Sequence, residues 1–197
     1  MADLDALTET IGLAFADDPV WSRTLAHPDG DLVDRAAFWR LSLQGALRFP
    51  WLWMWEGAEA AAVWIPPGED ELSPDQASAR ERLAKTSLGP RGASYLEAVD
   101  RCFVAARPHD EPHYYLSLLG THPAHRGRGL GVALVAENLT RIDAEGAVAY
   151  LESSNPANDR RYERLGFEFR GRFQLPDDGP TVTTMWRPAR KAPKSSL

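Results

Sequence analysis

Residues 113–138 read HYYLSLLGTHPAHRGRGLGVALVAEN, and this stretch sets the architecture that we expect for the whole chain. The run at 113–121 predicts a strand, and the apolar stretch from Val132 predicts a helix. The turn between them holds Arg126, Gly127, Arg128, Gly129, Leu130 and Gly131. Glycine lets a backbone approach a ligand closely, the free N–H groups of a helix's first turn attract an anion, and arginine adds positive charge. The stretch is therefore typical of a site that cradles a pyrophosphate.

The spacing of the glycines excludes two common phosphate-binding motifs. Val132 follows the third glycine, so the GxGxxG dinucleotide fingerprint is not met, and no Lys-Ser or Lys-Thr follows the turn as in a P-loop. The turn matches Arg-x-x-Gly-x-Gly instead, at Arg126, Gly129 and Gly131. A helix cap with incidental arginines remains the alternative at this point.

Length and composition indicate one globular domain. Of 197 residues, 44% are apolar and 25% charged, and we assign residues 1–188 to a single domain and 189–197 to a flexible tail. The net charge of −6 argues against nucleic-acid binding, and no apolar run approaches the roughly 18–20 residues that span a bilayer. The acidic N-terminus is not a secretory signal. Because Cys102 is the single cysteine, we expect a reducing cytoplasm and no metal ion.

The remaining segments predict an α/β protein. Apolar spacing and breakers predict helices at about 4–16, 32–47, 74–87, 91–106 and 158–165. Strands are predicted at 147–152, 167–173 and 181–186, and a hairpin is predicted from 51–55 and 60–65. The alternation of strand and helix in the second half indicates a mixed sheet.

A second segment, residues 147–169, reads AVAYLESSNPANDRRYERLGFEF. Asn158 and Tyr162 are four residues apart, so they lie on one face of the short predicted helix. Together with Arg-x-x-Gly-x-Gly, this segment resembles the GNAT acetyltransferase superfamily. The resemblance implies the GNAT fold, a mixed and mostly antiparallel central sheet flanked by helices, with acetyl-CoA as co-substrate.

A closer resemblance runs through LAFADDPVW, AAVWIPPG and LGTHPAHRGRGLG, which are similar to the puromycin N-acetyltransferases. It implies direct acetyl transfer to the amine of a small molecule in a ternary complex. A protein or peptide N-acetyltransferase and a non-catalytic acyl-CoA-binding module are the two further functions left open. Family members usually begin with an edge strand, whereas here a helix is predicted almost from Met1. A sheet edge left exposed in this way needs a cover, and a homodimer is one expectation.

The resemblance also implies which residues hold the donor. Residues 126–131 would bind the phosphates of coenzyme A. Leu119, Gly120 and Thr121, at the end of the central strand, would pair with the amides of its pantetheine arm. Asn155 and Asn158 would bind the arm from the opposite side. The alternatives are that Asn155 only shapes the turn before a proline and that Asn158 caps the short helix.

The transfer itself needs a proton donor and a proton acceptor. Tyr162 matches the superfamily's general acid, which protonates the departing thiolate, and its alternative is a core tyrosine. Glu152 matches an acidic residue of the puromycin-type relatives and is our first choice of base, against a surface or binding carboxylate. Tyr115, Ser117, His113 and a chain of waters are weaker candidates for the base.

Tryptophans cluster in the predicted hairpin. Trp51, Trp53 and Trp55 alternate and therefore share one face of a strand, and Trp64 lies on the next strand. Trp53, Trp64 and Tyr115 are candidates for contact with the acceptor, on which aromatic rings could stack. Tryptophans at strand spacing more often belong to a core.

Overall fold

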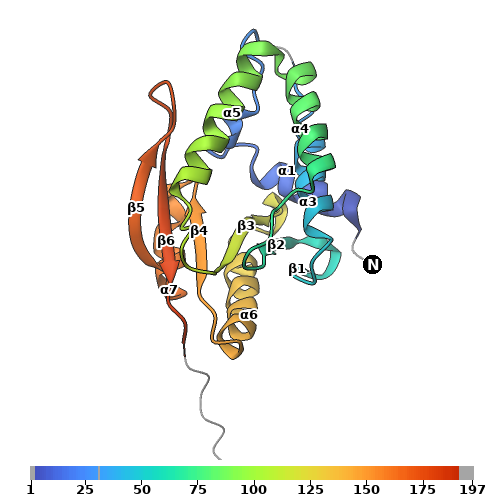
Figure 1. Ribbon diagram of the computed structural model, residues 1–197. Coiled ribbons are helices and arrows are strands. Elements are labelled where there is room, and N and C mark those ends of the chain that lie inside the picture. Colours follow the sequence, from blue (N-terminus) through green and yellow to red (C-terminus); the bar gives the residue numbers. More distant parts are fainter. Residues whose placement is uncertain (1–2, 31, 191–197) are drawn as a thin grey trace, which may run out of the picture.

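A computed structural model describes residues 3–30 and 32–190, so that residues 191–197 of the predicted tail lie outside the described part. The helices are α1 (Leu4–Ala14), α2 (Trp21–Thr24), α3 (Arg35–Ala46), α4 (Pro74–Ser87), α5 (Gly89–Ala106), α6 (Leu130–Ala144) and α7 (Asp159–Arg164). The strands are β1 (Leu52–Met54), β2 (Ala60–Ile65), β3 (Tyr114–Thr121), β4 (Ala149–Ser153), β5 (Glu168–Gln174) and β6 (Thr181–Arg187). Figure 1 shows how they are arranged.

The strands form one sheet in the order β1-β2-β3-β4-β6-β5. Only β3 and β4 are parallel, and the other neighbours are antiparallel. The crossover between the two parallel strands is α6, which follows the glycine-rich turn directly. The mixed, mostly antiparallel sheet predicted from the sequence is therefore confirmed.

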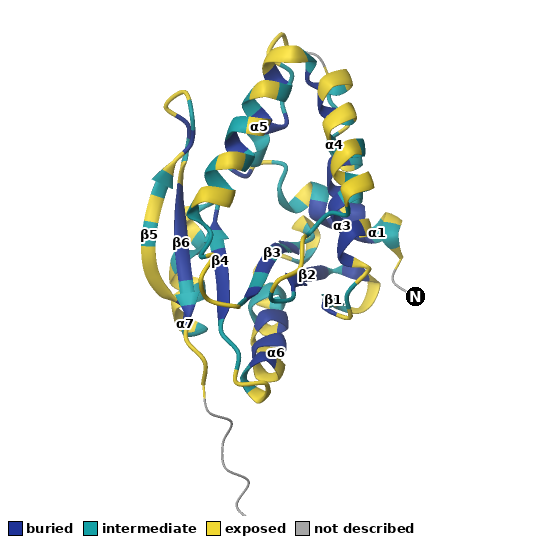
Figure 2. Cartoon of the chain, in the orientation of Figure 1, coloured by how far each residue is buried: buried dark blue, intermediate teal, exposed yellow. Residues whose placement is uncertain are grey.

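Helices cover both faces of this sheet (Figure 1). On one face α6 packs with Leu134, Val135 and Ile142 against buried strand residues. On the other face α1 and α3 contribute Ile11 and Leu43 to a second buried cluster. Figure 2 shows the buried residues concentrated where these helices meet the central strands, while α4 and the outer surface of α5 are largely exposed. The sheet is thus buried on both faces at its centre, where the predicted site lies.

The α4–α5 hairpin confirms the two helices predicted on either side of Gly89. Ser73 begins α4 with a capping box, in which its side chain and that of Gln76 each bond the other's backbone N–H. Gly89 has a φ of 65°, a left-handed conformation that ends the first helix and suits glycine. Arg80 then makes two hydrogen bonds to Asp100, which fasten the helices together.

The sequence did not predict α2, a helix of four residues. It begins where Pro19 was expected to end the first helix, because the Asp18 side chain accepts hydrogen bonds from the N–H groups of Val20 and Trp21. Such a short helix has no apolar repeat to reveal it. Its side-chain cap is what starts a new turn after the break.

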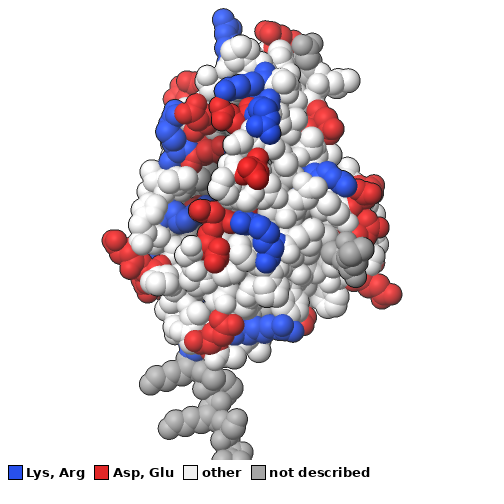
Figure 3. All heavy atoms as spheres, turned by 45° about the vertical axis from the view of Figure 1, so that its right-hand side comes forward, with Lys and Arg blue, Asp and Glu red and all other residues white. Residues whose placement is uncertain are grey.

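One edge of the sheet is β1, only three residues long. A short edge strand offers few unpaired backbone groups, which limits edge-to-edge pairing with another chain. Among the described residues, no helix is both long and apolar enough to cross a membrane. On the face drawn in Figure 3, Lys and Arg side chains are interspersed with Asp and Glu.

Candidate active site

The sheet opens at its centre. The parallel strands β3 and β4 pair over Tyr114–Leu116 and Ala149–Leu151, but β3 continues to Thr121 and β4 to Ser153 without further pairing between them. A cavity of about 890 Å³ lies between the diverging ends. Its walls come from β3, β4, the glycine-rich turn, α1, α2, α5 and α7. The topology therefore joins the two sequence signatures in one site.

The glycine-rich turn forms one end of this cavity. Gly127 and Gly129 have φ values of 81° and 75°, so the turn uses left-handed backbone that a larger residue would strain. Gly129 is the N-cap of α6, and Leu130 and Gly131, at the start of that helix, line the cavity. The N–H groups of a helix's first turn have no partner within the helix. This end is therefore suited to bind an anion.

Two other glycines are needed for packing rather than for conformation. A Cβ on Gly131 would lie 2.9 Å from Thr121 Oγ1, so α6 rests closely on the end of β3. A Cβ on Gly120 would lie 2.8 Å from Cδ1 of Ile11 in α1. Both contacts bring a helix against β3 where the strand borders the cavity. Leu119, Gly120 and Thr121, the residues predicted to pair with the pantetheine arm, all line it.

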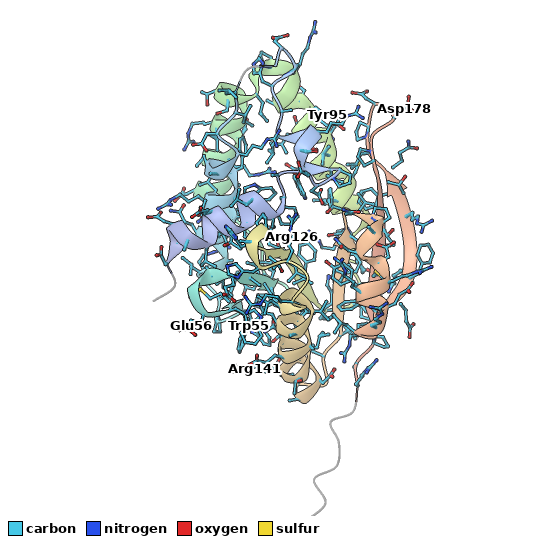
Figure 4. All side chains as sticks on the ribbon, turned by 180° about the vertical axis from the view of Figure 1, so that it is seen from behind. Trp55, Glu56, Tyr95, Arg126, Arg141 and Asp178 are labelled. Atoms are coloured by element: carbon cyan, nitrogen blue, oxygen red, sulfur yellow. The ribbon has the colours of Figure 1, made fainter. Side chains whose placement is uncertain are left out.

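The two arginines of the turn have different surroundings. Arg126 lines the cavity and donates a hydrogen bond to the Ala14 carbonyl (3.2 Å), and Figure 4 shows it at the turn that precedes α6. Arg128 does not line the cavity; its guanidinium lies 3.4 Å from Glu59 and 2.9 Å from His125. Of the two arginines predicted to bind phosphate, Arg126 thus lines the cavity and Arg128 does not.

The α7 side adds further positive charge that the sequence did not single out. Arg161 and Arg164 line the cavity together with Asn155 and Asn158. The side-chain oxygen Oδ1 of Asn158 accepts a hydrogen bond from Arg161 (2.7 Å) and does not cap α7. Asn155 accepts from the Ala157 N–H (3.1 Å), which is the turn-shaping contact expected before a proline. Neither arginine belongs to a recognised motif, which is why sequence reasoning passed over them.

Tyr162 projects from α7 into the same cavity. Its ring packs edge-on against Phe167, with 6.1 Å between centroids. Burial raises the pKa of its phenol to about 12, and the nearby carboxylates Asp18 and Asp159 add to the shift. The phenol therefore keeps its proton at neutral pH.

Glu152 lies at the end of β4 with a side chain only 1% exposed. Neither carboxylate oxygen makes a hydrogen bond within the described residues, although the Tyr115 and Tyr150 hydroxyl groups lie close enough to lower its pKa. Burial outweighs these effects and raises the pKa of Glu152 to about 7. A buried carboxylate that lacks well-formed hydrogen bonds is costly, so a ligand that supplies them would be bound well here.

Arg107 is the cation beside this carboxylate, and no motif in the sequence indicates it. Its Nε lies 3.9 Å from Glu152 Oε1, and its guanidinium stacks 3.9 Å above the centre of the Tyr115 ring. Tyr115 also lines the cavity, and burial raises the pKa of its phenol well above the usual value. Arg107 follows the last residue of α5 and meets Glu152 only through the fold.

Ser117 and His113, the weaker candidates for the base, differ in position. Ser117 lines the cavity, whereas His113 does not. The Nδ1 of His113 lies 2.7 Å from the Glu111 carbonyl oxygen, and its ring packs against Tyr150 and Trp186. Burial lowers the pKa of His113.

The lining of the cavity also includes acidic and aromatic residues. Asp17 and Asp18 line it, as do Trp21 and Phe103, whose rings stack with centroids 5.7 Å apart. Burial also raises the pKa of Asp18, against hydrogen bonds from Ser154 and two backbone N–H groups that lower it.

Trp53 and Trp64, two of the candidates for acceptor contact, lie away from this cavity. Trp64 is 0% exposed and donates a hydrogen bond to the buried Asn138 of α6 (2.9 Å). Trp53 packs against the same cluster beneath the guanidinium of Arg141, 3.9 Å from its ring centre. Figure 4 shows Arg141 on α6 and Trp55 near the hairpin end. These tryptophans therefore belong to the core, and of the three candidates only Tyr115 reaches the site.

Comparisons with known proteins agree with this geometry. Residues 92–167 match the model of the acetyltransferase (GNAT) family. A Corynebacterium glutamicum protein described as histone acetyltransferase HPA2 and related acetyltransferase is 25% identical, with a TM-score of 0.64 over 98% of this chain and 94% of that one.

Two further solved structures share the fold at lower identity. An agmatine N-acetyltransferase is 20% identical with a TM-score of 0.60, covering 93% of each chain. Arylalkylamine N-acetyltransferase 2 of Aedes aegypti is 12% identical with a TM-score of 0.63, covering 94% of each chain. The matched segment runs from α5 through β3, the glycine-rich turn, α6 and β4 to α7. The family match over residues 92–167 and the shared fold thus support a GNAT acetyltransferase, a superfamily whose members transfer an acetyl group from acetyl-CoA to an amine.

Proposed function

We propose that the protein acetylates the amine of a small molecule by direct transfer, with acetyl-CoA and the acceptor bound together in the cavity. The observation that carries this proposal is Glu152, a buried carboxylate whose oxygens have no hydrogen-bond partner among the described residues and which faces a cavity that also reaches the glycine-rich turn. An enclosed carboxylate suits a slender amine. The small amines named for two structures of the same fold support this class of acceptor.

The residues present fit coenzyme A. Gly127 and Gly129 take left-handed backbone with open space where a Cβ would stand, so the turn can lie directly against phosphate. Arg126 adds positive charge at this end, and Asn155 and Asn158 offer side-chain amides on the other wall. When bound there, acetyl-CoA supplies the thioester that is attacked. A Gly129→Val variant should bind coenzyme A at least tenfold more weakly by calorimetry, because valine resists a positive φ. Wild-type affinity in that variant would contradict the assignment.

Glu152 is proposed to take the proton of the acceptor amine. An amine with an ordinary pKa near 10.4 arrives as an ammonium ion and must lose a proton before it can attack. A carboxylate whose pKa is raised to about 7 is a stronger base than an ordinary glutamate and is still largely ionised just above neutral pH.

Tyr162 is proposed to stabilise the sulfur that leaves. Complete proton transfer from a phenol of pKa about 12 to a thiolate of ordinary pKa near 8.5 would be uphill by roughly 5 kcal/mol. Tyr162 therefore acts first as a hydrogen-bond donor to the negative charge that develops on sulfur, and gives up its proton only as the bond breaks.

A thiol-release screen tests the proposed function. Purified protein with acetyl-CoA is assayed against aliphatic amines, arylalkylamines, amine-bearing antibiotics and short peptides with a free N-terminus or lysine. Release of coenzyme A with small amines, lost in Glu152→Gln, is the expected result. Release with peptides alone would favour a protein acceptor. Tight coenzyme A binding without release for any compound would favour a non-catalytic module.

A further inference from the structure

Asp18 is a buried carboxylate that stands apart from the ion pairs of the protein. It is 8% exposed, and no ion pair joins it to any residue that the structure describes. Oδ1 accepts from the N–H groups of Val20 and Trp21, at 3.0 and 3.1 Å, and Oδ2 accepts from the Ser154 hydroxyl at 2.7 Å. A carboxylate offers about four lone-pair sites, so acceptor capacity remains.

The bond to Ser154 fixes where this charge stands. Ser154 lies just beyond the end of β4, two residues after Glu152, and both residues line the cavity. Asp18 comes from the segment between α1 and α2, so its hydrogen bond to Ser154 brings it to the end of β4 that carries Glu152. The site therefore presents two buried acids from different segments near the end of one strand.

The carboxylates of Glu152 and Asp18 differ in their hydrogen-bond donors and in their charged neighbours. Neither oxygen of Glu152 receives a hydrogen bond from a described residue, and its cationic neighbour Arg107 stays 3.9 Å away. Asp18 is held rigidly by three donors, but none of them carries a counter-charge. Trp21, whose N–H bonds Asp18, and Phe103, which stacks on Trp21, line the same cavity, and aromatic faces attract cations. Asp18 and these two rings therefore offer the groups that bind a cation.

Glu152 and Asp18 are expected to meet acceptor groups of different charge. The reacting amine must become neutral, so the acid that takes its proton gains no lasting ion pair. A second carboxylate that stays ionised can instead form a lasting ion pair with a group that stays positively charged throughout the reaction. We propose that the acceptor carries two cationic groups, the amine that reacts near Glu152 and a second ammonium or guanidinium group held by Asp18. This inference rests on the proposed function and narrows it to diamines and their guanidino counterparts.

Occupation of Asp18 would also assist the reaction. The Asp18 charge contributes to the raised pKa of Tyr162, because a nearby negative charge disfavours ionisation of the phenol. A cation at Asp18 offsets that charge and makes Tyr162 a better donor to the leaving sulfur. Binding of the second group would thus increase kcat as well as lower KM.

Paired substrates of equal length test the inference. With acetyl-CoA saturating, thiol release is measured for pentylamine against diaminopentane and for butylamine against diaminobutane and aminobutylguanidine. We expect wild-type kcat/KM to be at least tenfold higher for each dication. In Asp18→Asn and in Asp18→Ser, which retains a cap for α2, the ratio should fall to within threefold of unity.

The matched control is Glu168→Gln, which removes one negative charge from the exposed edge strand β5 and should keep the wild-type ratio. Equal kcat/KM within the wild-type pairs, a clear preference for phenylethylamine over diaminopentane, or an unchanged ratio in both Asp18 variants would each overturn the inference. If no amine releases thiol, the proposed function fails, and calorimetric binding of diaminopentane then tests the Asp18 site independently of catalysis. Binding of diaminopentane to the wild-type protein but not to Asp18→Ser would support a cation site at Asp18. Absence of binding to the wild-type protein would refute it.

Discussion

Replacing Arg107 with Met tests the role of Glu152 without altering the carboxylate itself. The two charged groups approach to 3.9 Å, Nε to Oε1. Unit charges at that distance interact by about 4 kcal/mol at an effective dielectric constant of about 20. Because the Arg107 side chain is 30% exposed, solvent screening reduces this by about half, to about 2 kcal/mol or roughly 1.5 pKa units.

The sign of the effect follows from the charges. Arg107 favours the ionised form of Glu152, so its loss should raise the pKa of that carboxyl from about 7 to roughly 8.5. A base works only when ionised. The kcat/KM of Arg107→Met should therefore be about eightfold below wild type near pH 7.5 and within about twofold of it near pH 9.5.

The assay is thiol release measured from pH 6 to 10 with one amine at low concentration. The acceptor's own ionisation also shapes this profile, so Arg101→Met serves as the control. It removes one positive charge from the same helix, α5, at an exposed site paired with Glu97. An acidic limb that does not move relative to this control, or an equal loss of activity at every pH, would refute the role assigned to Glu152.

Three other expectations concern single side chains. Tyr162→Phe should lower kcat about 100-fold and leave the calorimetric affinity for coenzyme A unchanged, and full turnover would rule out the donor role. Gly45→Ala should cost about 2–3 kcal/mol of unfolding free energy in urea, because its methyl group would lie 2.2 Å from a backbone carbonyl oxygen of the loop before α4. Gly12→Ala, with its nearest neighbour at 3.7 Å, should be neutral or stabilise α1 by up to about 1 kcal/mol, and equal effects would contradict the packing. Asp143→Ala should cost about 3–5 kcal/mol, since it leaves the buried Arg187 guanidinium unpaired, and a loss below about 1 kcal/mol would show that the pair is dispensable.

The segments that the sequence predicted well are those in which local pattern and function coincide. Residues 113–138 carry a strand, a turn and a helix whose boundaries the structure moves by only a few residues. The glycines there are required either by backbone conformation or by close packing. Both requirements fix the positions of the glycines, and the resulting spacing can be recognised in the sequence. Helical spacing placed Asn158 and Tyr162 on one face in the sequence, and both residues line the cavity.

The features that were missed depend on contacts between distant segments. Arg107 ends one helix, Glu152 ends a strand, and no local pattern links them. The tryptophans show a different limit: alternation establishes that Trp51, Trp53 and Trp55 share a face, but a sheet covered on both sides gives no sign of which face meets the ligand. Asp18 bonds the backbone N–H of Val20 and also borders the cavity, and the second of these positions depends on the tertiary fold.

The short β3–β4 ladder also bears on the order in which ligands bind. Three residue pairs join the half-sheet β1-β2-β3 to the half-sheet β4-β6-β5, and beyond them the two strands part. Such a junction allows the halves to rotate slightly about the paired segment, so a donor lodged between the strand ends would set how far apart they stand. Amide exchange at residues 117–121 should then slow on addition of coenzyme A while 114–116 stay unchanged. The side of the cavity that carries Glu152 and Ser154 would reach the separation from β3 needed to bind the acceptor only after the donor is bound. This predicts a compulsory binding order, with the donor first and the acceptor second.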